Sequence, residues 1–269
     1  MLTTVQIHKR RERYMSLQSE ITAHVTAVYK GKNCWKVELP MLLDKVGREH
    51  ATRNKSVSLA TLKARRQIMT QFFKELFELG YKLPSIYSFR EKHAKVLFSK
   101  WETDGLSAST LQSRYTCMQL FSTWIGKYDM LQPLEKYLSN PLAGKRTYVA
   151  TEDKSWDVND VMTEEIITKA MAMDKYVGHQ LKLIKAFGIR RKEAVCFRPH
   201  VCIDQDNNVI QVYQGTKGGR YRVVPIRTEE QHSVLAECCR LAKRHSDHIG
   251  NPEKTLEQNL RRLQYILER

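Results

Sequence analysis

Apolar residues recur at steps of three and four along most of the chain, which is the spacing of one face of an α-helix. The pattern is clearest in the first half, where it predicts helices over residues 9–30, 58–80, 89–105 and 106–126. Residues 31–57 are poorly patterned and are assigned no element. An Asn140–Pro141 break and a short basic stretch follow. We therefore expect a helical first half that ends near residues 140–151.

The second half alternates between two periodicities. Three short strand-like stretches with turn residues between them stand inside a helical pattern. The expected strands are 201–203, 208–214 and 220–226, and the expected helices are 163–174, 176–187, 190–197, 228–244 and 255–268. The predicted fold class is mainly α with a small antiparallel β-sheet. The predicted parts are a basic helical segment over 1–57, a helical domain over 58–145 and a mixed α/β domain over 146–269.

The charge balance points to a polyanionic partner. The 269 residues include 45 Lys and Arg against 29 Asp and Glu, a formal net charge of +16. The excess is spread along the chain and is densest in the first half. A distributed excess of this kind favours nucleic acid as the partner, and a merely basic protein is the alternative.

Neither a membrane nor a metal is indicated. No apolar run approaches the roughly 18 residues of a membrane span, and the start of the chain lacks the apolar stretch of a signal peptide. The six cysteines form no Cys-x-x-Cys pair, which favours reduced thiols in a cytoplasmic protein. Cys239, His245 and His248 match no familiar zinc spacing, so no metal is expected.

Two stretches, "GIRRKEAV" at 188–195 and "GTKGGRYRVVPI" at 215–226, carry candidate chemistry. Gly188 breaks one helix, and Arg190 begins the next, where an arginine can hold two phosphate oxygens. Glu193 lies one turn later and could tether Arg190. The two-glycine turn places Lys217 at a hairpin tip, where it could neutralise phosphate or donate a proton. Taken singly, each stretch also fits an ordinary solvated surface.

Together and in this order, the two stretches resemble tyrosine recombinases, the phage integrase family. That family typically shows Gly-Leu-Arg-x-x-Glu at a helix start, matched here by residues 188–193. A hairpin with Thr-Lys-x-Gly and Arg-x-Val-Pro follows, matched by 216–219 and 222–225. The stretch "LSASTLQSRYTCMQLFSTWI" followed by "NPL" resembles the core-binding domain of such integrases. The resemblance covers roughly residues 58–269.

The resemblance implies a chemistry without a metal or cofactor. A tyrosine hydroxyl attacks a DNA phosphate, and cationic side chains stabilise the developing charge. By resemblance, Arg190 is one such arginine, Lys217 protonates the leaving oxygen and Glu193 braces the site. The implied partner is double-stranded DNA in the bacterial cytoplasm, with self-association on DNA as in the family. The candidate DNA-binding residues are Arg191, Lys192, Arg220, Arg222, Arg114, Arg65 and Arg66.

The family also requires a His-x-x-Arg box and a nucleophilic tyrosine after the hairpin. None of His232, His245 and His248 has an arginine three residues later. Of the late tyrosines, Tyr221 lies within the hairpin, and Tyr265 stands in an apolar helix pattern typical of a packing residue. The chain stops in mid-helix, so the simplest interpretation is a catalytic domain cut before the box, with no nucleophile present.

Three functions remain open at this point. The first is a DNA integrase represented by its DNA-binding part and part of its catalytic domain. The second is a non-catalytic DNA-binding protein or regulator built on the same scaffold. The third is a basic RNA-binding or structural protein, for which the order of Arg190 and Lys217 would carry no meaning.

Overall fold

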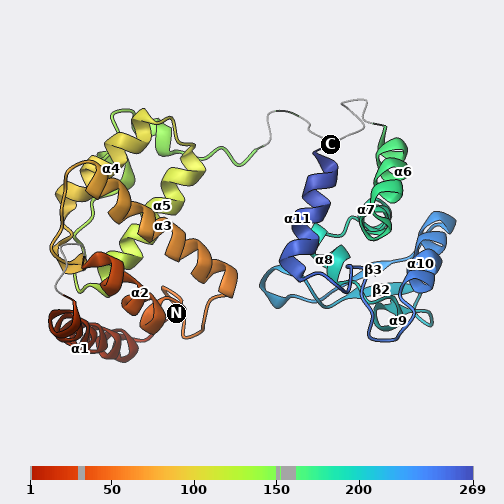
Figure 1. Cartoon of the computed structure of the whole chain (residues 1–269), viewed down its shortest axis with the longest axis horizontal. Coiled ribbons are helices and arrows are strands. Elements are labelled where there is room, and N and C mark those ends of the chain that lie inside the picture. Colours follow the sequence, from red (N-terminus) through yellow and green to blue (C-terminus); the bar gives the residue numbers. More distant parts are fainter. Residues whose placement is uncertain (1, 30–33, 150–151, 153–161, 269) are drawn as a thin grey trace. The chain divides into compact units, whose positions relative to one another are not determined.

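The computed structural model describes residues 2–29, 34–149, 152 and 162–268. The chain divides into two compact units, Met1–Val149 and Ala150–Arg269, which we call the N-terminal and C-terminal units (Figure 1). The N-terminal unit is helical, whereas the C-terminal unit adds a three-stranded antiparallel sheet. The predicted fold class, mainly α with a small antiparallel sheet, is thus confirmed.

The N-terminal unit is built from amphipathic helices around an aromatic core. Serine side chains cap two of the helices, Ser58 by accepting from Thr61 N and Ser107 by accepting from Thr110 N. The long helices α3 and α5 lie side by side (Figure 1). The helices are α1 (Thr4–Val28), α2 (Trp35–Val46), α3 (Leu59–Glu78), α4 (Glu91–Thr103) and α5 (Ala108–Trp124), with short 3-10 turns at η1 (Ile86–Ser88), η2 (Leu134–Lys136) and η3 (Pro141–Gly144).

Helices α1 and α2 share the core of the N-terminal unit. The face of α1 predicted from its spacing is buried, at Tyr14, Leu17, Ile21 and Val25. The helix α2 was not expected from the sequence. Its buried positions Leu39, Leu42, Leu43 and Val46 join the same cluster as the aromatic residues of α3, α4 and α5. The helices α1 and α2 are therefore part of this unit's packing.

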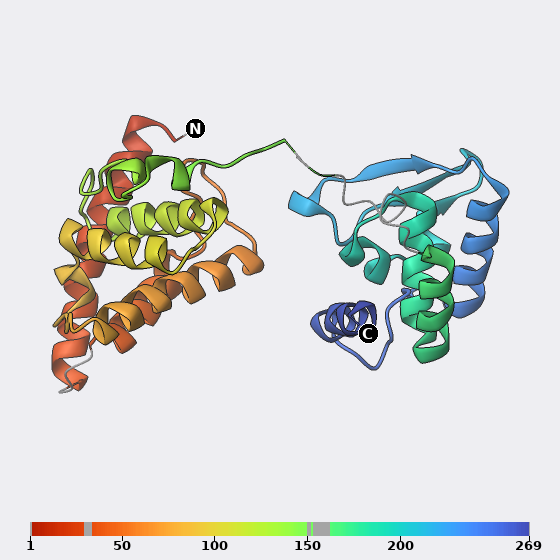
Figure 2. The same cartoon turned by 90° about the horizontal axis from the view of Figure 1, so that it is seen from above.

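The C-terminal unit combines helices with a small sheet. Figure 2 shows α6 and α7 side by side, and the two helices contact each other. The sheet has the order β1–β2–β3, with Val209 opposite Pro225 and Val212 opposite Arg222. Its elements are α6 (Thr163–Met173), α7 (Lys175–Phe187), α8 (Arg191–Cys196), α9 (Pro199–Cys202), β1 (Ile203–Asp204), β2 (Val209–Val212), η4 (Lys217–Gly219), β3 (Arg222–Pro225), α10 (Glu229–Leu241) and α11 (Leu256–Leu267).

One strand prediction is partly wrong. Val201 and Cys202 belong to the helix α9, and the strand β1 begins only at Ile203. Pro199 stands at the first helical position, where its fixed φ and missing N–H are tolerated. The proline therefore starts a short helix in a stretch whose β-branched residues favoured a strand.

Candidate functional site

The site begins at the break between α7 and α8. Gly188 ends α7 in the left-handed conformation, with φ 59° and ψ 26°, and its N–H donates to Ile184 O. Arg190 then takes the N-cap position of α8. The sequence predicted this break and helix start. The side chain of Arg190 is 59% exposed, so its guanidinium can meet a partner.

Glu193 joins Arg190 to the sheet. Its carboxylate accepts hydrogen bonds from Arg190 N at 2.7 Å, from Arg190 Nη1 at 2.8 Å and from Arg222 Nη2 at 2.5 Å. Its side chain is 0% exposed. A buried carboxylate with three donors, two of them from guanidinium groups, is a strong local restraint. Arg222, a predicted DNA-binding residue, is the first residue of β3, and its guanidinium pairs with Glu193.

The environment of Glu193 keeps it ionised. Burial alone would raise the pKa of this carboxyl group. The hydrogen bonds from the backbone and side chain of Arg190 and from Arg222 outweigh burial, so the pKa of Glu193 lies below its ordinary value. The site therefore holds two arginines around one fixed negative charge.

The loop between β2 and β3 packs on the start of α8. Gly215, in this loop, has φ 76°. A Cβ atom added there would lie 2.6 Å from Lys192 O and 2.8 Å from Glu193 N. Only glycine fits this approach, because a side chain would meet backbone atoms and would also be strained at that φ. Gly215 thus fixes the loop that carries Lys217 against the helix that carries Arg190.

Lys217 lies two residues beyond this contact. It begins the turn η4, in which Gly218 has φ 75°, and its side chain is exposed. Within the described part of the chain, Lys217 has no acidic partner. At the base of the loop, the rings of Tyr213 and Tyr221 stack with centroids 5.4 Å apart. Lys217 is therefore an unpaired cation on a loop anchored at both ends.

The other predicted basic residues fall into two groups. Arg191, Lys192 and Arg220 are exposed and lie on α8 or the loop. Arg65, Arg66 and Arg114 lie in the N-terminal unit and already have partners. Arg65 is buried and donates to Gly47 O and Glu49 O, Arg66 pairs with Asp44 at 2.8 Å, and Arg114 lies 3.6 Å from Glu75 with its guanidinium over the Trp101 ring. Arg65 and Arg114 thus have roles within the fold.

The late histidines and tyrosines are dispersed. His232 lies on α10, His245 is exposed, and His248 accepts a hydrogen bond from Gly250 N. Tyr265 lies on α11, 42% exposed, with the Arg262 guanidinium 5.6 Å above its ring. Among the described residues, no group of three or more His, Cys, Asp or Glu side chains is arranged to hold a metal. No helix within the described ranges is long and apolar enough to cross a membrane.

The sequence pattern indicated Arg190, Glu193 and Lys217 as candidates, but it did not indicate two features that hold them. One is the packing of Gly215 on α8, for which the only sequence signal was a glycine ahead of the Thr-Lys pair. The other is the Arg222–Glu193 ion pair. Arg222 was selected for its charge, and its partner lies 29 residues away in the sequence.

Two protein-family models match parts of this chain. Residues 144–259 match the family described as "Integrase", and residues 44–131 match "Phage integrase, N-terminal". No curated protein matches the chain significantly. Among solved structures, the crystal structure of XerA recombinase is 14% identical, covering 79% of this chain and 70% of that chain, with a TM-score of 0.30. That structural similarity is too low to support an argument about the fold.

The two family models match consecutive parts of the chain, and the boundary between them falls between α5 and α6. The second model spans α8, the loop and β3, where Arg190, Glu193 and Lys217 lie. The order of motifs in the sequence and the two matches agree, and the chain belongs to the tyrosine recombinase, or phage integrase, family.

Proposed function

We propose that this chain binds duplex DNA and that its C-terminal unit presents Arg190 and Lys217 to one DNA phosphate. The observation that carries the proposal is the packing of Gly215 against the Lys192–Glu193 peptide. This packing places the loop that carries Lys217 against α8, whose N-cap residue is Arg190. Glu193 supports the geometry by bonding both Arg190 and Arg222. Both proposed cations have exposed side chains, so a phosphate can reach them.

The proposed chemistry is strand cleavage and joining through a phosphotyrosyl intermediate. The oxygen of a tyrosine that has lost its proton forms a bond to phosphorus, and the bond from phosphorus to the 5′ oxygen breaks. Arg190 stabilises the charge on the phosphoryl oxygens, and Lys217 gives a proton to the leaving 5′ oxygen. Glu193 is a positioning residue, because its carboxylate is buried and bound on three sides. We assign no nucleophile among the 269 residues and propose that this chain is catalytically incomplete.

The two units have separate tasks in this proposal. Residues 58–145 act as the core-binding domain and grip the duplex, while residues 146–269 address the phosphate. The net charge of +16 supports a DNA partner. Self-association on DNA and a cytoplasmic location follow from the family resemblance alone.

One observation favours a second function, a non-catalytic DNA-binding protein on a recombinase scaffold. None of the three histidines after Lys217 has an arginine three residues later. Such a protein would bind duplex DNA, and it would not need Arg190 and Lys217 for any reaction.

The first test is binding of the 269-residue chain to labelled duplex DNA by fluorescence anisotropy. The logarithm of affinity should fall linearly with the logarithm of salt concentration, with a slope of about −0.9 for each phosphate contacted. Affinity that does not change with salt, or that is no higher for duplex DNA than for RNA, would reject the proposal.

The second test asks whether Arg190 and Lys217 act on the phosphate that is cleaved. In a form of this protein that cleaves DNA, Arg190→Ala and Lys217→Ala should each lower the cleavage rate about 10²–10³-fold, as is typical for loss of one charge stabiliser. Arg191→Ala is the matched control, because Arg191 is the adjacent exposed arginine. Equal losses for Arg190→Ala and Arg191→Ala would show that the stretch is only a charged surface.

A further inference from the structure

A second cationic feature lies in the N-terminal unit, where α1, the end of α2 and the 47–56 loop meet. It is a pocket of about 630 Å³, which we call the basic pocket. The match to the family described as "Phage integrase, N-terminal" begins only at residue 44, so the side of the pocket formed by α1 lies outside it. The pocket is lined by Leu2, Gln6, Lys9, Arg10, Arg13, Lys45, Arg48, Glu49, Asn54, Lys55 and Ser56.

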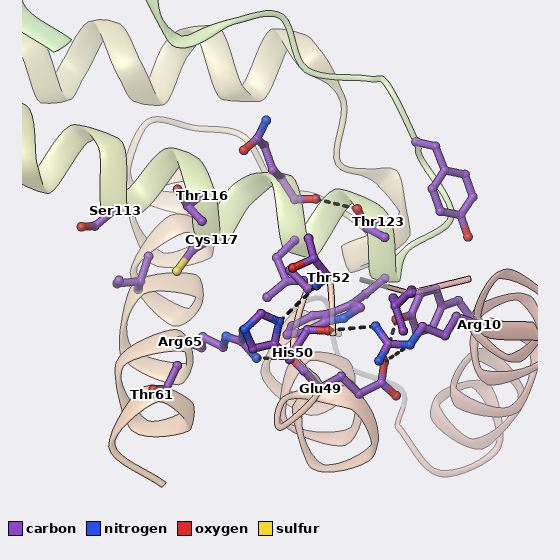
Figure 3. A pocket seen from close by; sticks show the side chains of 18 of the residues that line it. Arg10, Glu49, His50, Thr52, Thr61, Arg65, Ser113, Thr116, Cys117 and Thr123 are labelled. Atoms are coloured by element: carbon purple, nitrogen blue, oxygen red, sulfur yellow. Dashed lines mark hydrogen bonds and ion pairs between the residues drawn. The ribbon is translucent and has the colours of Figure 1, made fainter. Parts of the chain in front are cut away.

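The pocket has a hydrogen-bonded frame centred on Glu49 and Arg10. Glu49 pairs with Arg13 and accepts a hydrogen bond from Tyr14 OH at 2.7 Å. Arg10 donates to His50 O at 2.8 Å and to Arg53 O at 3.2 Å, which ties α1 to the loop. Figure 3 looks into the adjoining cavity of about 980 Å³ and shows the guanidinium of Arg10 next to Glu49 and His50, with dashed lines at its contacts. The frame holds the loop, so the pocket is not an accident of free side chains.

The basic pocket is lined by more positively charged side chains than nearby acidic residues neutralise. Six of its lining residues are Lys or Arg, and one, Glu49, is acidic. Arg13 and Arg10 face Glu49, and Lys45 pairs with Glu20 at 3.1 Å. The other three cations have no acidic partner within the described ranges of the chain. They are Lys9, Arg48 and Lys55.

The pKa of His50 reflects the same excess of positive charge. Burial lowers the pKa of His50, and nearby cations lower it further, because a second positive charge is unfavourable beside them. Those cations are Lys55, Arg53, Arg65 and Arg10. Two neutral polar side chains, Asn54 and Ser56, line the basic pocket and can donate hydrogen bonds.

We propose that the basic pocket binds a phosphate group. Several cations with neutral donors around a concave site suit an anion with several acceptor oxygens, and arginine holds such oxygens in pairs. In the context of the proposed DNA binding, on which this inference rests, the phosphate is one of the duplex backbone. The α1 segment would then add a contact to DNA that neither matched family region supplies. A free polyphosphate has the same chemistry, and the experiment distinguishes the two sources.

The test compares two triple variants of the full chain. The pocket variant is Lys9→Ala/Arg48→Ala/Lys55→Ala. The control is Lys82→Ala/Lys92→Ala/Lys95→Ala, which removes the same charge from exposed lysines elsewhere in the N-terminal unit that also lack an acidic partner in the described chain. In the pocket variant, the slope of log affinity for duplex DNA against log salt should become shallower by about 0.9 for each phosphate that the pocket no longer neutralises. The control should change the slope by less than the pocket variant does, and equal changes in the two variants would mean that the pocket adds nothing beyond general surface charge. Circular dichroism and thermal melting establish that both variants fold.

A second measurement uses inorganic tripolyphosphate as the probe, by titration calorimetry. Loss of tripolyphosphate binding in the pocket variant alone, with an unchanged DNA slope, would retain the phosphate site and assign it to a free polyphosphate. Unchanged DNA slope and unchanged tripolyphosphate binding in the pocket variant would overturn the proposal. Binding of polyglutamate as tight as that of tripolyphosphate would also overturn it, because the pocket would then accept any polyanion. Wild-type chain that fails to bind DNA would reject the proposed function, and the tripolyphosphate measurement would still decide the pocket.

Discussion

Glu193 is the residue on which the arrangement of the C-terminal unit most depends. Its buried carboxylate accepts from Arg190 in α8 and from Arg222 in β3, so one side chain joins a helix start to a strand. Removing the charge would leave both guanidinium groups without their anion. Hydrogen bonds to charged groups contribute about 1.5–3 kcal/mol each, and we expect a loss within that range for Glu193→Gln, because the amide retains part of the bonding.

The loss should depend on pH. The pKa of Glu193 is lowered in the folded state, so its stabilisation is fully present above the unfolded value, ordinarily 4.5, and is lost as the pH falls through the folded value. The melting temperature of Glu193→Gln should therefore lie well below wild type at neutral pH, and the difference should shrink as the pH falls below 4.5. Glu253→Gln, an exposed control, should match wild type at both pH values. A difference for Glu193→Gln that is constant with pH would contradict the ion-pair account.

At the residue scale, the sequence was most informative about the candidate site residues. Arg190, Glu193 and Lys217 stood out because their order matched a family pattern. The constraints on Gly215 and Arg222 arise from tertiary contacts between β3, its loop and α8, and no local pattern encodes them. Arg65 illustrates the same limit, since its charge suggested a partner outside the protein and the fold uses it to bind the carbonyls of Gly47 and Glu49.

At the scale of elements, the loop between β2 and β3 acts as one unit with α8. Gly215→Ala would place a methyl group 2.6 Å from Lys192 O at a φ of 76°. Strain of this kind costs about 1–3 kcal/mol, and the backbone must shift to relieve the clash. We expect a lower melting temperature and faster amide hydrogen exchange over residues 213–221.

The matched control for that substitution is Gly219→Ala. Gly219 has a similar φ of 69°, but no atom lies within 4 Å of the added Cβ. It therefore reports the strain of the backbone alone. If the two variants exchanged and melted alike, the contact between the loop and α8 would not hold the loop in place.

The helix α2 shows why elements can be missed. Its buried positions Leu39, Leu42, Leu43 and Val46 follow helical spacing. Pro40 lies inside the helix, and an internal proline normally argues against one because it removes a backbone hydrogen bond. Burial of this apolar face against the core outweighs that cost. The helices α1, α3, α4 and α5 contain no proline, and their apolar residues recur at steps of three and four, so the sequence was sufficient to predict them.

At the scale of the whole molecule, each unit has its own core. The cluster that contains Phe72, Phe121 and Trp101 draws only on the N-terminal unit, and the clusters around Ile210 and Leu263 draw only on the C-terminal unit. Residues 1–149 expressed alone should therefore fold, with a cooperative thermal transition and the helical circular dichroism of α1 to α5. The fragment should also keep the basic pocket, and hence bind tripolyphosphate. A fragment without a cooperative transition would show that the units depend on each other for stability.

The last prediction tests the proposal that the 269 residues are catalytically incomplete. Charge stabilisation by Arg190 and Lys217 lowers a barrier only if a nucleophile attacks the phosphate. Two tyrosines follow Lys217. Tyr221 stacks on Tyr213 at the base of the loop, and Tyr265 lies on α11 under Arg262. Neither follows a His-x-x-Arg box. We therefore expect the chain to bind DNA without forming a covalent link to it.

A nicked suicide substrate, which traps any phosphotyrosyl adduct, followed by a denaturing gel, checks this expectation. The gel should show no shifted band at a salt concentration where anisotropy shows the duplex to be bound. A shifted band that disappears in Tyr265→Phe would make Tyr265 the nucleophile. A band that disappears in Tyr221→Phe would make Tyr221, at the base of the loop that carries Lys217, the nucleophile. Either result would mean that another residue takes the place of the arginine of the His-x-x-Arg box. Arg222 would be the first to examine, because Glu193 already holds it beside Arg190.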